Sequence, residues 1–163
     1  MRAVRQSGNK STERRLRGSL IASGLTGWAV DARSVEGRPD FFFCKERVAV
    51  FVDGCFWHGC LKCGHLPTKN RTFWATKISQ NKNRDAAVRR RLQRSRVAIL
   101  RFWEHEVAVD PRSCVLRIAE IVMTRRRRRA KRTSSRVSAG PAHPARASKQ
   151  AVDARRRVSG RSA

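Results

Sequence analysis

The segment with the densest set of candidate functional residues is Phe51-Val52-Asp53-Gly54-Cys55-Phe56-Trp57-His58-Gly59-Cys60-Leu61-Lys62-Cys63-Gly64-His65. It begins as the end of an apolar run and then loses both helical and strand periodicity, while glycine, cysteine and histidine accumulate. Its three cysteines have a C-x4-C-x2-C spacing. Thiolates this close together, in a segment that glycines allow to turn tightly, suit a tetrahedral zinc ion. We therefore predict that a structural zinc ion orders this loop.

The fourth zinc ligand has two candidates. His65 lies nearby, whereas His105 follows directly after an apolar run that ends at Trp103. We favour His105, because a distant ligand pins the loop to the sheet and stabilises the fold more than a local clip does. The alternative to a metal site is a set of reduced core thiols, which a cytosolic protein keeps unpaired. Three cysteines within one irregular loop favour zinc over that alternative.

Aromatic side chains occur as two adjacent pairs, Phe56-Trp57 and Phe73-Trp74. An isolated pair usually belongs to a core. The first pair, however, lies between expected metal ligands, where a loop cannot easily bury both rings. Rings wedged between base steps must overcome base stacking, which a mismatch has already weakened. Phe56 and Trp57 are therefore candidates for insertion into DNA beside a mismatch.

Carboxylates and a histidine surround the same region. Asp40 follows a Gly37-Arg38-Pro39 turn and precedes one apolar run, and Asp53 ends the next. Two carboxylates at one end of a hairpin can hold Mg²⁺, which prefers oxygen ligands and activates water for attack on a phosphodiester. His58 can then act as the base for the attacking water. Taken singly, such residues are more often turn formers or structural groups.

Three further polar residues are candidates for supporting roles. Asn81 and Asp85 are four positions apart on an expected helix, so they share one face and can orient a catalytic histidine or a water. The alternative is a solvated helix surface. Glu13, near the start of the first expected helix, carries the same ambiguity.

Periodicity beyond the loop predicts an α/β fold with a small mixed sheet flanked by helices. Helices are expected over 11–23, 73–95 and from Asp110-Pro111 onward. Strands are expected over 41–44 and 47–52, as a hairpin, and over 97–103. We place one domain over residues 1–124 and a disordered, arginine-rich tail over residues 125–163. The tail is either a non-specific DNA tether or an extension without a role.

The charge of the chain points to a polyanionic partner. The sequence holds 38 Lys and Arg against 12 Asp and Glu, a net charge of +26. Residues 1–124 alone hold 24 against 11, so the expected domain is basic without the tail. This excess favours nucleic acid. With no apolar run of membrane-spanning length and no signal peptide, we expect a cytoplasmic, nucleoid-associated bacterial protein that acts as a monomer.

The combined pattern resembles the very short patch repair family of DNA mismatch endonucleases. The likeness covers roughly residues 1–122, and its central block is 51–60. The flanking blocks that also match are Thr12-Glu13 with Leu16 and Leu20, Gly37-Arg38-Pro39-Asp40, Phe73-Trp74, Lys77-Ile78, Asn81, Arg84-Asp85 and Phe102-Trp103-Glu104.

The resemblance implies a degenerate PD-(D/E)xK nuclease fold with one structural zinc. It also implies a substrate, duplex DNA with a T:G mismatch left by deamination of 5-methylcytosine, which the enzyme nicks 5′ to the thymine. By position, Asp40 and the backbone carbonyl of Val52 bind Mg²⁺, while Glu13 lies near the metal-bound waters. His58 matches the catalytic histidine and Asp85 its orienting partner. The aromatics Phe56, Trp57 and Trp74 match those that intercalate, and Cys55, Cys60, Cys63 and His105 fall at or near the zinc positions.

The chain also departs from the family pattern. Asp53 replaces a second histidine of better-known members; a carboxylate there can join the metal but cannot donate a proton at neutral pH. The N-terminus is expected to begin inside the family's first segment. Two alternatives to the mismatch endonuclease follow: a less selective, restriction-like nickase, and a catalytically inactive zinc module that only binds DNA. Other mismatch-repair proteins are possible partners.

Overall fold

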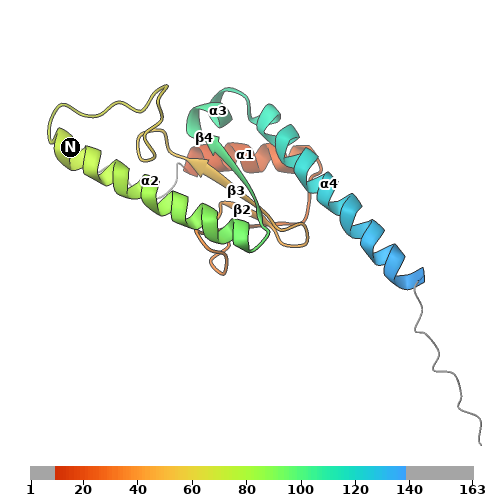
Figure 1. The fold of residues 1–163 in the computed structure, drawn as a ribbon. Helices are drawn as coiled ribbons and strands as arrows, with labels where there is room; N and C mark the ends of the chain where they lie inside the picture. Colours follow the sequence, from red (N-terminus) through yellow and green to blue (C-terminus); the bar gives the residue numbers. More distant parts are fainter. Residues whose placement is uncertain (1–9, 139–163) are drawn as a thin grey trace, which may run out of the picture.

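The protein is a four-stranded sheet flanked by helices, shown by a computed structural model that describes residues 10–138 (Figure 1). In chain order the elements are α1 (Lys10–Ala22), β1 (Trp28–Val30), β2 (Phe41–Phe43), β3 (Val48–Asp53), α2 (Arg71–Arg94), β4 (Ala98–Trp103), α3 (Glu104–Val109) and α4 (Pro111–Ser138). The predicted small mixed sheet flanked by helices is confirmed. Within the described residues, no helix combines the length and apolar character that a bilayer crossing requires.

The sheet topology brings distant residues to one edge. The strand order is β1-β2-β3-β4, with antiparallel pairing up to β3 and parallel pairing between β3 and β4. The hairpin register pairs Phe41 with Val50, and the parallel register pairs Asp53 with Trp103. Because β2 begins where β3 and β4 end, residues before β2 and after β3 and β4 meet at the same edge.

Alternating side chains give the sheet two packed faces. Val48 and Val50 of β3 face a large core formed with α1, α3 and α4, in which Leu16, Phe102 and Ile118 are fully buried. Ala49 and Phe51 of the same strand face the other way, against Val88 and Leu92 of α2. Because successive side chains of β3 point to opposite faces of the sheet, α2 packs against one face and the other three helices pack against the other.

Two elements were not predicted, and both are short. Strand β1 has three residues at the sheet edge, and α3 has six. Neither length gives a hydrophobic period that the sequence can display. Helix α3 matters for the site, because it carries His105 where the sequence led us to expect only the end of a strand.

The expectation that disorder begins at residue 125 is wrong for residues 125–138, which continue helix α4. Arg125 donates to the backbone carbonyls of Glu46, Arg47 and Arg96 at 3.0, 3.3 and 3.1 Å. Arg126 donates to Glu46 Oε1 at 2.8 Å and to the carbonyl of Thr26 at 2.6 Å. Composition alone predicted repulsion, but arginine has good helix propensity and these acceptors hold the helix against the domain.

Two other predictions concern parts of the chain that the structure does not cover. The remainder of the expected tail, 139–163, lies outside the described residues, and so do residues 1–9, on which the expectation of a shortened N-terminus depends. The domain boundary at residue 124 stays a prediction.

Candidate active site and metal centre

A cleft of about 740 Å³ lies between the sheet and α2. It is lined by Asp40, which directly precedes β2, by His58 from the loop that follows β3, and by Asp85 from α2. The other charged residues of its lining are Glu36, Arg38, Asp53, Arg84, Arg91 and Arg101. The structure thus brings together three of the residues that the sequence singled out for phosphodiester chemistry, whereas Glu13 is not among the residues that line the cleft; their roles stay predictions.

Asp40 is positioned by a tight turn and by β3. Gly37 has φ +78°, and a side chain there would meet Val88 at 2.4 Å, so only glycine fits. The Oδ2 atom of Asp40 accepts a hydrogen bond of 2.7 Å from the Val52 N–H. Burial raises the pKa of Asp40 to about 7, and the charges of Glu13 and Asp53 act in the same direction against the Val52 hydrogen bond. A carboxylate short of water and close to other negative charges suits a bound cation.

His58 and Asp85 form a close pair at the cleft wall. His58 Nδ1 lies 2.5 Å from Asp85 Oδ2, and both side chains are about one-fifth exposed. Burial opposes ionisation of Asp85, but the hydrogen bond with His58 and the charge of Arg101 outweigh it, so the pKa of Asp85 is lowered. One turn earlier, Asn81 donates to the carbonyl of Trp57 at 2.9 Å. The four-residue spacing on α2 therefore holds both His58 and the residue before it.

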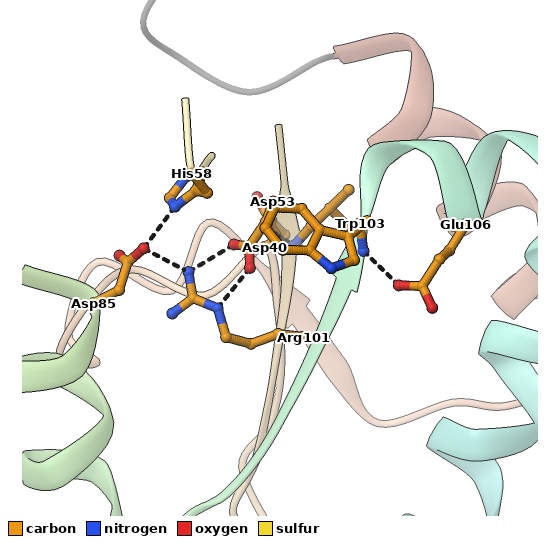
Figure 2. A network of polar contacts seen from close by, with 8 residues as sticks. Asp40, Asp53, His58, Asp85, Arg101, Trp103 and Glu106 are labelled. Atoms are coloured by element: carbon orange, nitrogen blue, oxygen red, sulfur yellow. Dashed lines mark hydrogen bonds and ion pairs between the residues drawn. The ribbon is translucent and has the colours of Figure 1, made fainter. Parts of the chain in front are cut away.

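Arg101 is the cleft residue that sequence reasoning missed. Its Nε and Nη2 atoms donate to the two carboxylate oxygens of Asp53 at 2.6 Å each, and Nη2 also lies 3.1 Å from Asp85 Oδ2 (Figure 2). Its guanidinium lies 5.1 Å from the centroid of the Phe51 ring. A single charge inside the apolar run 97–103 was the available signal, because a strand side chain so placed must find a partner.

Three cysteines and a histidine converge beside the cleft. The Sγ atoms of Cys55, Cys63 and Cys60 lie 3.2, 3.4 and 3.8 Å from Nδ1 of His105. All four ligand atoms lie within 4.8 Å of one another. Tetrahedral zinc with bonds of about 2.0–2.3 Å separates its ligands by about 3.5–3.8 Å, so the donor set and the spacing both fit zinc.

The alternative ligand His65 points elsewhere in the structure. Its Nδ1 lies 3.3 Å from the carbonyl of Cys63, outside the group of converging ligand atoms. Gly64 is required in this loop, because a side chain would meet the Cys60 carbonyl at 2.5 Å. Burial raises the pKa of the Cys55 thiol to about 12, so a metal is needed to hold it as a thiolate.

The four aromatics of the two sequence pairs form one cluster, here called the aromatic cluster: Phe56, Trp57, Phe73 and Trp74. Trp74 from α2 lies edge-on to Phe56 and Trp57 of the loop, with ring centroids 5.2 and 5.8 Å apart. Phe73 is 60 % exposed, and the other three rings are half-buried. The cluster belongs to neither of the two core clusters of the described chain, so the rings pack on one another rather than into the sheet.

Comparison with known proteins adds an independent observation. A family model described as "DNA mismatch endonuclease Vsr" matches residues 1–63. The chain is 38 % identical over 121 residues to the Type II nicking enzyme V.NaeI of Lentzea aerocolonigenes, covering 71 % of this chain and 72 % of that protein. It is 39 % identical over 110 residues to V.NmeDIP of Neisseria meningitidis serogroup C (63 % and 74 %). It is 37 % identical over 106 residues to the DNA mismatch endonuclease Vsr of Escherichia coli K12 (64 % and 66 %).

Proposed function

The chain belongs to the Vsr family of strand-nicking DNA endonucleases, and we propose that it nicks duplex DNA 5′ to the thymine of a T:G mismatch in a Mg²⁺-dependent reaction. The observation that carries this proposal is that Asp40 and the His58–Asp85 pair line one cleft together with four arginines. Arginines beside such a site can receive the phosphates on either side of the bond to be cut.

Asp40 is the residue we assign to the magnesium ion, with the backbone carbonyl of Val52 as a second ligand and Glu13 acting on the bound waters. The chemistry of the site supports this, because Asp40 is buried among carboxylates that a divalent cation would neutralise. When bound, Mg²⁺ polarises the phosphodiester and stabilises the charge that develops on its oxygens. Both oxygens of Asp53 already accept from Arg101, so we assign Asp53 to positioning that guanidinium rather than to the metal.

His58 is the residue we assign to proton transfer. With Nδ1–H donating to Asp85, its Nε2 carries a lone pair that can accept the proton of the attacking water. Asp85 fixes this tautomer and stabilises the imidazolium that results. Arg101 keeps Asp85 ionised through its nearby charge.

Recognition of the mismatch is assigned to three members of the aromatic cluster, Phe56, Trp57 and Trp74. Phe56 and Trp57 directly precede His58 in sequence, and the three rings pack on one another, where they are available to a weakened base step. A T:G pair stacks and pairs less well than T:A, so the cost of wedging it open is lower. The same chemistry in a cleft without such rings would cut with less selectivity.

The zinc-type group is assigned a structural role. It joins the loop after β3 to α3 at the sheet edge, so it holds His58 and the aromatic cluster in place. Together with Asp40 at the start of β2, this arrangement supports the degenerate PD-(D/E)xK fold that the resemblance implied.

The test is a single-turnover nicking assay with Mg²⁺ on labelled duplexes that carry T:G or T:A in several sequence contexts. The proposal expects nicking of T:G alone, and its loss in Asp40→Ala and His58→Ala with DNA binding retained. Equal nicking of T:A would favour the second candidate function, a less selective nickase. The names of several relatives, which are Type II nicking enzymes, are the observation that favours this candidate. Parental nicking by either variant would refute the site assignment.

A further inference from the structure

A basic groove of about 590 Å³ lies away from the active site, between α4 and the turns that precede β3 and β4. We define the basic groove by the residues that line it: Lys45, Glu46, Arg47, Arg96, Arg125, Arg128, Arg129, Arg132 and Thr133. Seven of these nine are Lys or Arg, and the single acid, Glu46, is paired with Arg126. The groove therefore carries a concentrated positive charge that the fold itself does not neutralise.

The groove is built into the fold. The three carbonyls that receive Arg125 come from the β2–β3 turn and from the segment before β4, so this one side chain ties α4 to both turns. Arg126 adds a pair with Glu46, which is only 6 % exposed. These anchors determine which face of α4 meets the groove. One to two turns further along the helix, Arg128, Arg129 and Arg132 line the groove together with Lys45 and Arg96.

Several cations of the groove lack a partner among the described side chains, residues 11–134. The side chains of Lys45, Arg96, Arg128 and Arg129 make no hydrogen bond or ion pair in that part of the chain. Like charges gathered in this way repel one another unless an anion lies between them. Guanidinium groups in particular match the oxygen geometry of phosphate.

The groove and the active-site cleft lie on different sides of the molecule. The cleft lies on the α2 face of the sheet, toward the ends of β3 and β4, whereas α4 covers the other face. The groove adjoins the turns at the starts of β3 and β4, and the C-terminal half of α4 extends beyond that end of the sheet (Figure 1). A strand of six residues spans about 20 Å, the scale of the separation. Duplex DNA is stiff over about 150 base pairs, so a duplex in the cleft does not curl around to the groove.

We propose that the basic groove binds the phosphate backbone of a second DNA segment while the first occupies the active-site cleft. Within the described residues no large apolar side chain lines the groove, so it offers nothing to insert into a lipid surface. A second DNA-binding site would help an enzyme that must find rare mismatches, because the enzyme can transfer between DNA segments without dissociating from both. The binding step involves charge alone and adds nothing to the chemistry of nicking.

The experiment compares two matched double variants of the full-length protein. Arg128→Gln with Arg132→Gln removes two charges from the groove, and Arg127→Gln with Lys131→Gln removes two at the same spacing from residues of α4 that do not line it. A biotinylated 30-base-pair duplex on beads captures protein, and retention of a second, fluorescent 30-base-pair duplex is measured. We expect the second duplex to be retained by the parent and by the control pair, and to fall at least tenfold with the groove pair.

Three further measurements test how the two duplexes are bridged and whether the groove acts through charge alone. Sedimentation of the bridged complex should give one chain with two duplexes; two chains with two duplexes would overturn the proposal. Nicking of a 12-base-pair T:G duplex should be unchanged in both double variants, because the groove does not serve the duplex being cut. The salt dependence of binding to the second duplex should weaken in the groove pair by about 1.8 in log–log slope, for two phosphate contacts.

Three other results would also overturn the proposal. These are equal retention by the two double variants, an equal fall in 12-base-pair nicking and bridging, and a preference of the groove for anionic vesicles or RNA over duplex DNA. If the parent fails to nick any duplex but still bridges two, the proposed function fails and the groove stands.

Discussion

Arg101 holds Asp53 by two hydrogen bonds of 2.6 Å and lies 3.1 Å from Asp85, so one guanidinium connects the end of β3 to the carboxylate that orients His58. The Arg101 and Asp53 side chains are only 16 % and 10 % exposed. The ionisation state of Asp85 therefore depends on Arg101, a residue outside the central block 51–60.

Replacement of Arg101 by Gln tests this dependence. The positive charge of Arg101 helps to lower the pKa of Asp85, so without it that pKa rises. Asp85 must be ionised to orient His58, and the acid limb of the nicking pH profile should therefore move to higher pH. Breaking a largely buried ion pair should also cost about 3–5 kcal/mol of unfolding free energy, measured by urea denaturation.

The control for this variant is Arg33→Gln, which removes an exposed Arg–Asp pair whose side chains do not line the cleft. We expect it to change neither the pH profile nor the urea midpoint appreciably. A stability loss in Arg101→Gln with an unshifted acid limb would mean that Arg101 serves the fold alone.

Asp85→Asn separates orientation of His58 from binding of DNA. Asparagine keeps the size of the side chain but removes the charge that fixes the His58 tautomer and stabilises its protonated form. We expect the single-turnover nicking rate to fall on the order of 100-fold, within the usual contribution of a general base. Binding of the T:G duplex, measured by fluorescence anisotropy, should stay within about threefold. Asp31→Asn, at an exposed turn, is the control that should nick at the parental rate.

Much of the fold was predictable because its long elements display their periods. The expected helix 73–95 is α2 shifted by two residues at its start, and the expected strand 97–103 is β4. β1 escaped prediction because its three residues gain order only by pairing with β2, which is tertiary information. The helical course of α4 beyond residue 124 escaped because Arg125 and Arg126 bind acceptors about 30 to 100 positions away.

The grouping of the candidate site was predictable from the family resemblance, but its electrostatics were not. Motif positions brought Asp40, His58 and Asp85 to one cleft, as expected. That Asp53 faces Arg101 follows from the parallel register of β3 and β4, which no local pattern displays. Strand pairing depends on the whole fold, so the position of the Arg101 charge next to Asp85 could be identified only from the structure.

The zinc site yields a prediction with a control built into the sequence. His105→Ala removes a ligand that the structure places in the group, whereas His65→Ala removes the histidine outside it. Metal analysis should give about one zinc per chain for the parent and for His65→Ala, and a clear loss for His105→Ala. Because burial raises the pKa of the Cys55 thiol to about 12, zinc binding should release a proton and weaken as the pH falls. Zinc retention by His105→Ala with loss in His65→Ala would reverse the ligand assignment.

Phe56, Trp57 and Trp74 of the aromatic cluster should determine the preference for T:G over T:A duplexes more than the rate of nicking. Trp57→Leu removes a ring that contacts both Phe56 and Trp74, so the wedge that opens a mismatched step is lost. We expect the ratio of T:G to T:A nicking to fall about tenfold, since stacking of one base on an aromatic is worth about 1–3 kcal/mol. Phe73→Leu is the control, because that ring contacts Trp74 only and is mostly exposed. An unchanged ratio in Trp57→Leu would remove the cluster from recognition.

Asp40→Asn should increase the stability of the protein at high pH and abolish its nicking activity. Since burial raises the pKa of Asp40 to about 7 from 3.8, the metal-free folded state binds a proton between these values that the unfolded chain releases. The stabilising contribution is complete below pH 3.8 and is lost as the pH rises through about 7, by up to about 4 kcal/mol. The asparagine of this variant cannot ionise, although its amide oxygen can still accept from the Val52 N–H.

The variant should therefore have a higher thermal midpoint than the parent at pH 8 in EDTA, and the difference should shrink toward pH 5. Adding Mg²⁺ should raise the midpoint of the parent at pH 8 and leave Asp40→Asn unchanged, because only an ionised carboxylate attracts the cation. Nicking should be lost in the more stable protein. Parallel midpoints for the two proteins from pH 5 to pH 8 would show that Asp40 is ionised without a metal, and the case for a cation at this carboxylate would then lack its electrostatic basis.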